Sequence, residues 1–351
     1  MFVEEGVPAV LVFDAEGFLG FVDAATGTVD AVGPPGEFSS AVFSPDLQHF
    51  AGVNTDGVLR VFTEHPTVDV EPGDGVQHLA FSPDGTTLAW GRDTLFEVWR
   101  WDDGGAPTTS DVGEFVGAIA FSPDDDPSRA LVAVGAETGT IYIVDRTDPA
   151  LISPVSPSPV NQLFDLAFKP VGASDEFGGV TYTLASTHSN GDVNLFDVMP
   201  GDGAEPFGFF ADTMIGHNDE ALEVAFAPDG RIASGDFSGE LVWWLDVAIP
   251  SLGFSRQDLV PAVWSDAAFA ASDQLVWLDG DFTAWSSPRV LSDSAENTAL
   301  VADTRVFSID AAGDVIAVGV EGGALVLDPD GTVVRELVAE DLLFAELVAL
   351  S

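Results

Sequence analysis

The sequence predicts an all-β protein made of repeated, four-stranded antiparallel units. Three observations predict this fold class. The string Phe-Ser-Pro-Asp recurs along the chain, a Gly-containing tight turn follows it, and an apolar residue followed by Asp closes the next segment. Alternating apolar and polar residues between such turns are typical of strands. With 46% apolar residues, the chain has enough core-forming side chains for a large folded domain.

A phenylalanine at the end of each first strand anchors the repeat. Full Phe-Ser-Pro-Asp strings begin at three positions, and weaker variants follow them. The predicted anchors are Phe43, Phe81, Phe121, Phe168, Phe226, Phe269, Phe307 and Phe344. A period of roughly 40 to 45 residues indicates a repeat architecture.

Each period contains the same succession of elements. Residues 76–81 illustrate the first strand, and Pro-Asp-Gly at 83–85 favours the turn that follows. Residues 87–90 and 131–134 illustrate the second strand. Glycine then permits a tight second turn, as at Gly57, Gly139, Gly191 and Gly239. The third strand is expected to end in an apolar residue and Asp, at 101–102, 144–145, 196–197, 245–246 and 327–328. A weaker fourth strand completes the unit.

The two ends of the chain together predict one further unit. Residues 7–14, 18–23 and 28–32 are expected to form a second, third and fourth strand without a first. Residues 342–350 are expected to form a first strand, although Leu, Ala and Glu there also permit a short helix. Pairing of the C-terminal strand with the N-terminal strands would remove open sheet edges. Eight anchors then predict eight units, with seven as the alternative because residues 259–300 carry the repeat weakly.

Four short strands per period, with FSPDG after the first and apolar-Asp after the third, resemble the WD40 repeat family. The resemblance covers essentially all of residues 1–351 and implies a single β-propeller domain of four-stranded antiparallel blades, closed by the pairing of both chain ends. The family's Gly-His dipeptide occurs once, at Gly216 and His217. Ser238 replaces the family's usual turn Asp in that repeat. The buried Asp-His-Ser-Trp network of the family is therefore expected to be incomplete.

The net charge of the chain is extreme. Asp and Glu number 58 against 11 Lys and Arg, the formal net charge is −47, and the only lysine is Lys169. Acidic side chains favour solubility, and molar salt shortens the Debye length to about 3 Å, which screens their repulsion. The composition resembles that of proteins from halophilic archaea or their viruses. Nucleic acid is not expected as a partner, because phosphate binding requires clustered Arg and Lys.

Targeting and membrane signals are absent from the sequence. The N-terminal residues are acidic and lead into no apolar run, so no signal peptide is predicted. No apolar run approaches the roughly 20 residues of a membrane span, and the chain contains no cysteine for a disulfide. We therefore expect a cytoplasmic protein without membrane insertion. A virion component assembled in the cytoplasm would look the same.

Motifs for catalysis or cofactor binding are also absent. The chain has no Gly-x-Ser-x-Gly, His-Glu-x-x-His or Gly-x-Gly-x-x-Gly motif, and Pro170 follows the only lysine, which excludes a P-loop. The acidic clusters at 124–126, 279–281 and 328–330 lack the spacing of a calcium loop. We therefore predict no catalytic residue, no cofactor and no metal site, and we interpret the anchor phenylalanines as core.

The predicted function is a non-enzymatic scaffold that presents a rigid face to a protein partner. In the family, the second turns and the links between blades lie on one face, and residues 199–220 are expected to be such a link. That face would gather the candidate partner-binding residues His188, Asn190, Met214, Ile215, His217 and Phe237. Exposed apolar clusters mark contact sites. The alternative is that Met214 and Ile215 turn inward and seal the junction between two blades.

Two other functions are compatible with the sequence. One is a structural, receptor-recognising or glycan-recognising component of a virus particle or cell surface. The other is a propeller hydrolase with catalytic acids in the central channel, where a catalytic pair cannot be identified among so many carboxylates.

Overall fold

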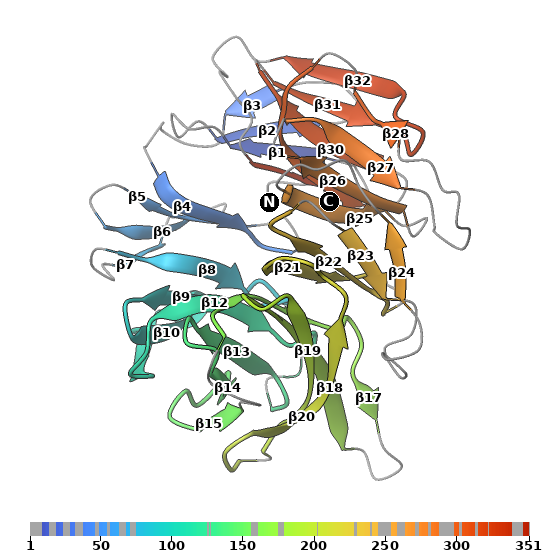
Figure 1. Cartoon of the computed structure of the whole chain (residues 1–351). Helices are drawn as coiled ribbons and strands as arrows, with labels where there is room; N and C mark the ends of the chain where they lie inside the picture. The colour runs from blue at the N-terminus through green and yellow to red at the C-terminus, as the bar shows by residue number, and fades with distance from the viewer. Residues whose placement is uncertain are drawn as a thin grey trace. The chain divides into compact units, whose positions relative to one another are not determined.

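The structure of the chain is a computed structural model (Figure 1). It describes residues 9–13, 19–23, 29–31, 38–45, 49–54, 57–62, 68–70, 75–124, 126, 128–155, 161–174, 179–201, 203–227, 230–238, 241–244, 254–257, 264–270, 274–279, 282–287, 298–301, 304–312, 315–321, 323–338 and 347–350. These residues form β-strands, one 3₁₀ helix, η1 (Trp101–Asp103), and no α-helix. Across the same residues, no helix is long and apolar enough to cross a membrane. The all-β prediction is confirmed.

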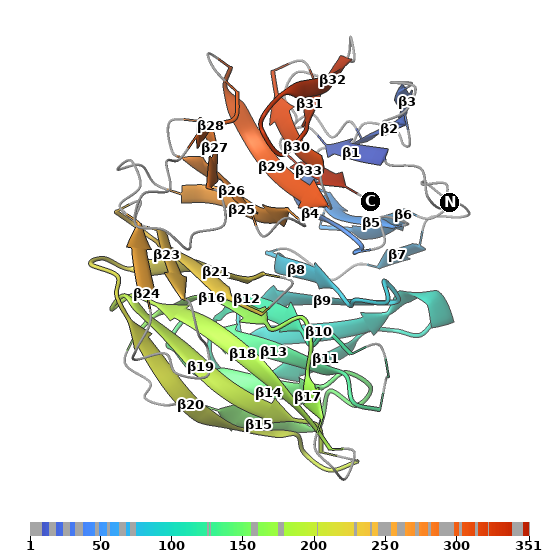
Figure 2. The ribbon, with the colours of Figure 1, turned by 90° about the vertical axis from the view of Figure 1, so that its right-hand side faces the viewer.

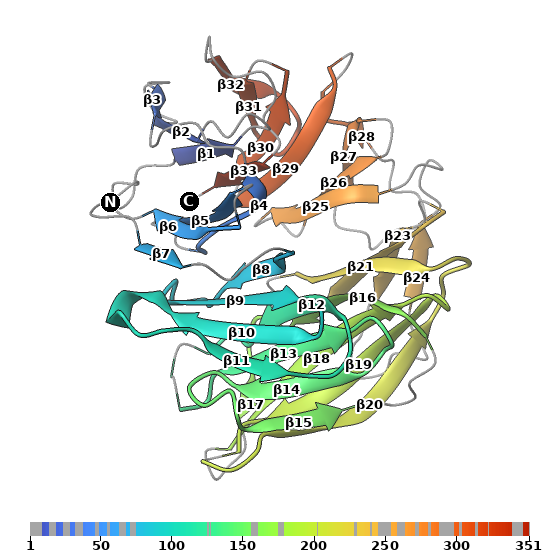
Figure 3. The same ribbon diagram turned by 90° about the vertical axis from the view of Figure 1, so that its left-hand side faces the viewer.

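The chain divides into two compact units, and each is described separately. The first unit comprises Met1–Asp69 and Leu259–Ser351, and the second comprises Val70–Asp258. Among the described residues, the second unit contains four antiparallel sheets (Figure 3). Their strands are β8 (Gln77–Phe81), β9 (Thr87–Arg92), β10 (Leu95–Arg100) and β11 (Thr108–Asp111); β12 (Val116–Phe121), β13 (Leu131–Ala136), β14 (Ile141–Asp145) and β15 (Ile152–Val155); β16 (Leu163–Phe168), β17 (Ala173–Ser174), β18 (Val180–His188), β19 (Asp192–Met199) and β20 (Phe207–Ile215); β21 (Ala221–Phe226), β22 (Ile232–Asp236), β23 (Leu241–Trp244) and β24 (Phe254–Gln257).

The described part of the first unit also contains four sheets. Their strands are β1 (Ala9–Phe13), β2 (Leu19–Asp23), β3 (Val29–Ala31) and β33 (Leu347–Leu350); β4 (Phe38–Phe43), β5 (Phe50–Asn54), β6 (Leu59–Phe62) and β7 (Val68–Val70), which ends at the unit boundary; β25 (Trp264–Ala270), β26 (Gln274–Asp279), β27 (Ala284–Ser287) and β28 (Thr298–Ala299); β29 (Val306–Ala312), β30 (Val315–Val320), β31 (Gly323–Leu327) and β32 (Val333–Val338). The sheet β25–β28 lies in the stretch where the sequence repeat is weakest.

Hydrogen-bonded neighbours in every sheet follow chain order, with two exceptions. The short strand β17 pairs with β18 beside its sheet, and β33 pairs with β1 (Figure 2). Leu350 lies opposite Val10, so strands from both ends of the chain share one sheet. A strand rather than a helix therefore forms at 347–350, and residues 342–346 lie outside the described residues. The prediction of four-stranded antiparallel units is confirmed.

A row of mostly apolar residues crosses the first three strands of every described sheet except the one that contains β1 and β33. Phe81 is aligned with Leu88 and Trp99 in the β8–β11 sheet. The corresponding rows elsewhere are Phe43, Phe50 and Phe62; Phe121, Val132 and Val144; Phe168, Leu184 and Phe196; Phe226, Ile232 and Trp244; Phe269, Leu275 and Ser287; and Ala311, Ile316 and Leu327. Where the structure describes their side chains, most of these residues are buried, as Phe81, Leu88 and Trp99 are. Their burial removes apolar surface from water, which explains why the anchors recur.

The register corrects one predicted anchor. Phe307 is the second residue of β29, beside a β-bulge, and its ring packs on Phe282 at 5.6 Å between centroids. Ala311 occupies the anchor position instead. The first strand of this sheet extends further than the sequence pattern indicated, since β29 ends at Ala312 and β30 begins at Val315. The last predicted anchor, Phe344, lies outside the described residues.

The register also corrects some predicted ends of third strands. Trp101 and Asp102 lie beyond β10 in η1, and Trp99 occupies the row position. Trp101 instead donates a hydrogen bond from its indole nitrogen to the Gly85 carbonyl at 2.9 Å. Trp244 holds the row position in β23, one residue before the predicted dipeptide at 245–246. Two bulky apolar residues lie close together in the sequence at each of these ends, Trp99 and Trp101 in one and Trp244 and Leu245 in the other. The sequence pattern therefore did not identify which of the two occupies the row.

Glycine permits close packing between neighbouring sheets of the second unit. A β-carbon on Gly91 of β9 would lie 2.6 Å from Cγ1 of Val116, the first residue of β12. A β-carbon on Gly135 of β13 would lie 2.5 Å from Cδ2 of Leu163, the first residue of β16. Larger residues at either position would push the next sheet away. Buried residues of successive sheets consequently form shared apolar clusters.

Candidate functional site

The sheets of the second unit have two ends that are joined in different ways. The link end contains the turns between second and third strands and the links between sheets; it includes residues 189–191 and 216–220. The FSPD end is the opposite end, with the turns between first and second strands and those between third and fourth strands; it includes residues 82–86 and 145–151. All six candidate partner-binding residues belong to elements that meet at the link end.

Backbone hydrogen bonds join the sheets at the link end. The amide of Val116 donates to the carbonyl of Asp93 at 2.9 Å, and the amide of Leu163 donates to the carbonyl of Glu137 at 3.2 Å. Asp93 and Glu137 belong to second turns of the preceding sheets. Second turns also bind the link before their own sheet, through Glu137 N to Phe115 O at 2.8 Å, Ser189 N to Gln162 O at 2.9 Å and Phe237 N to Glu220 O at 2.9 Å. Because peptide groups make these bonds, the bonds do not depend on which side chains the residues carry.

His188 ends β18 inside the protein rather than on its surface. Its exposed fraction is 3%, and its Nε2 lies 2.7 Å from the hydroxyl of Ser186. Burial lowers the pKa of His188, although a backbone hydrogen bond at Asn161 and the charge of Asp192 oppose the shift. The imidazole is therefore a structural group, which corrects its expected position on the contact surface.

His217 is also enclosed, in a network that the sequence analysis expected to be incomplete. Its Nε2 lies 2.7 Å from the Ser234 hydroxyl, and its Nδ1 lies 3.4 Å from a carboxylate oxygen of Asp236. Asp236 is fully buried at the end of β22 and also accepts hydrogen bonds from the amide and hydroxyl of Ser238. The aspartate thus stands two residues before the expected position. The Asp-His-Ser part of the network is present.

Met214 seals the junction between the β16–β20 and β21–β24 sheets. Its exposed fraction is 1%, and it packs in an apolar cluster with Val193, Leu195 and Ala221. Residues 207–215 form β20, the fourth strand of their sheet, rather than a link as expected. Alternation along this strand turns Met214 inward. The inward alternative is confirmed for Met214 and wrong for Ile215, its neighbour.

Asn190, Ile215 and Phe237 lie on the surface and form what we call the link-end patch. Ile215 is 71% exposed and Phe237 is 54% exposed. Asn190 precedes Asp192, which lies opposite Ile215 in the β19–β20 register. The Asn190 side-chain amide donates to the Asp192 carboxylate, which orders this turn. Two apolar side chains from neighbouring sheets therefore remain in water at one end of the unit.

In the described part of the second unit, four other exposed phenylalanines were not identified from the sequence. Phe115 precedes β12 and is 58% exposed, and Phe207, Phe209 and Phe210 lie on β20. Because residues 199–220 were interpreted as a link, the alternation in this segment was not used. The alternation of Phe207 and Phe209 was the signal that could have identified an edge strand with aromatic side chains outside.

Asp165 joins two sheets near the link end through its carboxylate. Its Oδ2 accepts a hydrogen bond from the Val224 amide of β21 at 3.0 Å, and its Oδ1 accepts one from the Leu166 amide at 2.8 Å. The hydroxyl of Thr187 donates to the carbonyl of Leu222, which also lies on β21, at 3.1 Å. Burial raises the pKa of Asp165 to about 6, and the two amide hydrogen bonds only partly oppose that rise.

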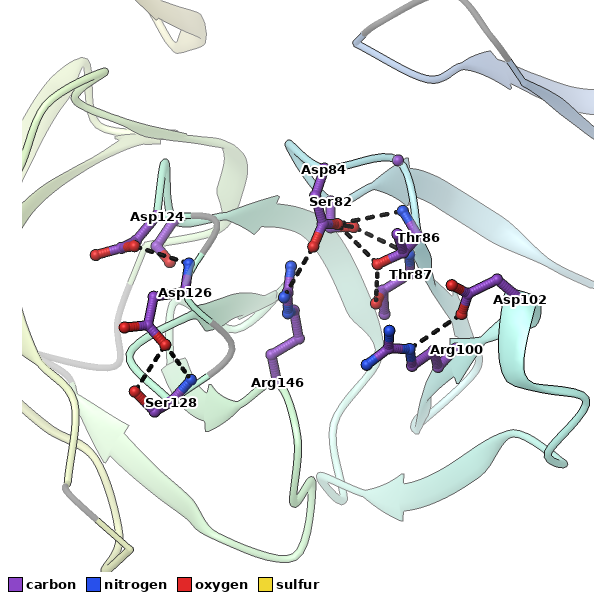
Figure 4. A network of polar contacts seen from close by, with 12 residues as sticks. Ser82, Asp84, Thr86, Thr87, Arg100, Asp102, Asp124, Asp126, Ser128 and Arg146 are labelled. Atoms are coloured by element: carbon purple, nitrogen blue, oxygen red, sulfur yellow. Dashed lines mark hydrogen bonds and ion pairs between the residues drawn. The ribbon is translucent and has the colours of Figure 1, made fainter. Parts of the chain in front are cut away.

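Side chains, in contrast, join the sheets at the FSPD end (Figure 4). Asp84 accepts hydrogen bonds from the Ser82 hydroxyl at 2.5 Å and from the Thr86 hydroxyl at 2.9 Å. Arg146, from the next sheet, contacts the other oxygen of Asp84 at 3.0 Å. Burial alone would raise the pKa of Asp84, but these hydrogen bonds and the guanidinium charge hold it below its ordinary value.

The FSPD aspartate of the following sheet is bound in a related way. The hydroxyl of Tyr182, which lies on β18, donates to the Asp124 carboxylate at 2.8 Å. Arg129 lies 3.4 Å from the same carboxylate. The FSPD motif therefore supplies a turn and also the acceptor for a side chain of the next sheet.

The described residues contain no group of three or more His, Asp or Glu side chains that could hold a metal ion. His188 and His217 contact serine hydroxyls inside the protein. The link end exposes two apolar side chains, Ile215 and Phe237, beside exposed polar residues such as Asn190 and Asp219.

The comparisons with known proteins address the fold. No protein-family model matches the chain. Among solved structures, the β-propeller domain of Cps50 (Swd1) from Myceliophteria thermophila matches with a TM-score of 0.57 and 12% sequence identity. The match covers 81% of this chain and 94% of that domain. The chain has the β-propeller fold.

Each sheet of the second unit is thus a propeller blade, and the two ends described above are the two ends of its blades. The low identity means that the likeness to Cps50 (Swd1) concerns architecture alone. The likeness therefore does not indicate what this propeller binds.

Proposed function

We propose that this propeller is a non-enzymatic scaffold and that the link-end patch contacts a protein partner. The observation that carries the proposal is the exposure of Ile215 and Phe237 on a chain whose net charge is −47. Burial of apolar surface contributes roughly 25 cal/mol per Å². Salt screens charge attraction but not this contribution. An apolar patch on an acidic surface is therefore suited to protein contact.

We further propose that the propeller is of the WD40 type. Two features support this assignment. The FSPD turns recur, and His217, Ser234 and Asp236 form the Asp-His-Ser part of the network that the WD40 resemblance implies. WD40 propellers are mostly scaffolds, which agrees with the absence of catalytic motifs in the sequence.

We also propose that residues 1–351 form a single domain of eight blades. It is supported by the eight sheets among the described residues and by the pairing of β33 with β1. Deletion of residues 347–350 would leave β1 with an unpaired edge. We expect the truncated protein to lose cooperative thermal unfolding. An unchanged melting curve would contradict closure of the domain by this pairing.

The acidic surface supports a working environment of high salt. We propose that the protein acts in a halophilic cytoplasm and does not bind nucleic acid. Its melting temperature is expected to rise strongly from 0.1 M to 2 M KCl, because the Debye length falls from about 10 Å to below about 3 Å. A melting temperature that does not depend on salt over this range would contradict the assignment.

The partner-binding proposal is tested by capture of cross-linked proteins from a cell extract in 2 M KCl. The test variant combines Ile215→Ser with Phe237→Ser. The matched control is Phe209→Ser. Phe209 is 52% exposed and lies on the same strand as Ile215, but toward the opposite end of that strand and so away from the patch. We expect the wild type and the control to capture the same protein and the test variant to lose it. Equal capture by all three proteins would reject the link-end patch.

A further inference from the structure

The FSPD end holds a cavity that the scaffold function does not use. It lies between the first two blades of the second unit and has a volume of about 320 Å³. Strands of the β8–β11 blade form one wall, and the turn after β14 in the next blade forms the other. Residues that matter for its chemistry are Thr87, Arg100, Asp103, Thr108 and Arg146.

Arg146 brings an incompletely bonded cation to this cavity. Its side chain is only 4% exposed, and one guanidinium nitrogen, Nη2, contacts Asp84 at 3.0 Å. The other, Nη1, is buried and has no hydrogen-bond partner among the described residues. An unsatisfied buried donor of this kind is costly, because it has lost its hydration without a replacement. An acceptor from outside the chain, either a water molecule or a ligand, would satisfy this donor.

Arg100 lines the cavity together with Arg146. Its Nε donates to Asp102 at 3.0 Å, and its side chain is 54% exposed. In Figure 4 its guanidinium extends from Asp102 toward the side on which Arg146 lies. No hydrogen bond from its two Nη atoms to another described residue is found. Two of only 11 basic residues in the chain thus share one cavity.

The charges around the cavity restrict the kind of ligand. Asp84 and Asp102 already neutralise one charge each on Arg146 and Arg100, and Asp103 adds a further negative charge at the wall. These carboxylates would repel a dianion such as phosphate more strongly than a single carboxylate. A guanidinium binds a carboxylate through paired hydrogen bonds.

The rest of the cavity suits a short carbon skeleton. Val98, Ala106 and Pro149 supply apolar wall, and the Thr108 hydroxyl is an additional donor. A cavity of about 320 Å³ is larger than a single ion and matches a small organic molecule. We propose that this cavity binds a small organic monocarboxylate, with its head group between Arg146 and Arg100.

Ligand-observed saturation-transfer NMR in 2 M KCl tests the proposal, with butyrate and inorganic phosphate as probes. The test variant is Arg100→Gln, because Arg100 is exposed and its loss leaves the Asp84–Arg146 pair intact. The matched control is Arg60→Gln, since Arg60 is likewise a surface arginine bound to one aspartate, Asp69, but in the other unit. Thr108→Val serves as a second variant that removes a donor without changing charge.

We expect wild type and Arg60→Gln to bind butyrate with equal affinity. Arg100→Gln should bind it roughly tenfold more weakly, which corresponds to the loss of a charge-assisted hydrogen bond. Thr108→Val should weaken the binding of butyrate by a smaller factor. Phosphate should not bind to any of these proteins. Butyrate binding that is absent in the wild type, or unchanged in Arg100→Gln, would overturn the proposal. Binding of phosphate in place of butyrate would overturn the carboxylate assignment.

Discussion

Neighbouring blades of the second unit are joined mainly by backbone groups at one end and mainly by side chains at the other. At the link end, amides and carbonyls such as Val116 N and Asp93 O join one blade to the next. At the FSPD end, side chains do so, as in the contact between Asp84 and Arg146. A backbone hydrogen bond does not depend on residue type. Exposed side chains of the link end, such as those of Ile215 and Phe237, can therefore change without loss of these hydrogen bonds, whereas the contact at the FSPD end requires Asp84 and Arg146.

This difference agrees with the functions that we propose for the two ends. The exposed residues Ile215 and Phe237 lie where the backbone holds the structure, so they are available to a partner. At the FSPD end, Asp84 and most of Arg146 are committed to blade contact, and only unused donors are left for a ligand. The predictions below test this division, from the largest expected effect on stability to the smallest.

Removal of the guanidinium at the FSPD end should have the largest effect. Arg146→Met keeps the length of the side chain but leaves the Asp84 carboxylate without its cation. Loss of one partner of a fully buried ion pair costs about 3 to 5 kcal/mol, and because the Asp84 side chain is 23% exposed, the cost here should be at most about 3 kcal/mol. Chemical unfolding in 2 M KCl should therefore show a destabilisation of that order. The double variant Asp84→Asn with Arg146→Met should recover part of it, and strict additivity of the two changes would contradict a direct contact.

The two inter-blade carboxylates should respond to pH in opposite directions. The pKa of Asp165 is raised to about 6, so its ionisation weakens the fold, and its contribution is lost as pH rises from about 4 to 6. The loss amounts to at most about 3 kcal/mol, given the ordinary pKa of 3.8. The pKa of Asp84 is lowered, so its contribution is present above about pH 4 and is lost as pH falls.

Unfolding free energies of the wild type, Asp165→Asn and Asp84→Asn between pH 3 and 7 measure this contrast. The stability advantage of the wild type over Asp165→Asn should shrink as pH rises, and its advantage over Asp84→Asn should grow. Parallel curves for the two variants would show that the carboxylates are not distinguished by their surroundings.

The sequence predicted the blades well because their signals are local. Turn residues such as those at 83–85 and anchors such as Phe81 define strands within one short segment. The contacts between blades were not predicted, because they join residues far apart in the chain. The partner of Asp84 is 62 positions away at Arg146. Asp236 was missed for a different reason, since the expected position for the aspartate was two residues later.

The candidate site was predicted only in part, because alternation decides exposure. Met214 and Ile215 are neighbours in one strand, so one must face inward when the other faces outward. Composition alone could not choose between them. The prediction that both behave alike followed from interpretation of residues 199–220 as a link, which β20 corrects.

Crowding of an inter-blade glycine should have an intermediate effect. A β-carbon on Gly135 would lie 2.5 Å from Leu163 Cδ2 and 3.1 Å from Leu166 Cδ1. We expect Gly135→Ala to destabilise the protein by about 1 to 3 kcal/mol, the usual cost of overpacking. Combination with Leu163→Val, which removes the closest carbon, should restore part of the stability. If the double variant is as unstable as the sum of the single changes, steric contact between the blades is not the cause.

Changes in the link-end patch should have the smallest effect on stability. Ile215 and Phe237 are 71% and 54% exposed, and the adjoining blade contact uses the Phe237 amide, which every residue except proline retains. Ile215→Ser and Phe237→Ser should therefore each change the free energy of unfolding by less than about 0.5 kcal/mol. Met214→Ala is the contrasting variant in the same strand, and its buried side chain should cost about 2 to 5 kcal/mol. A large destabilisation by either serine variant would mean that the patch is part of the blade junction, and then its apolar side chains would not be available to a partner.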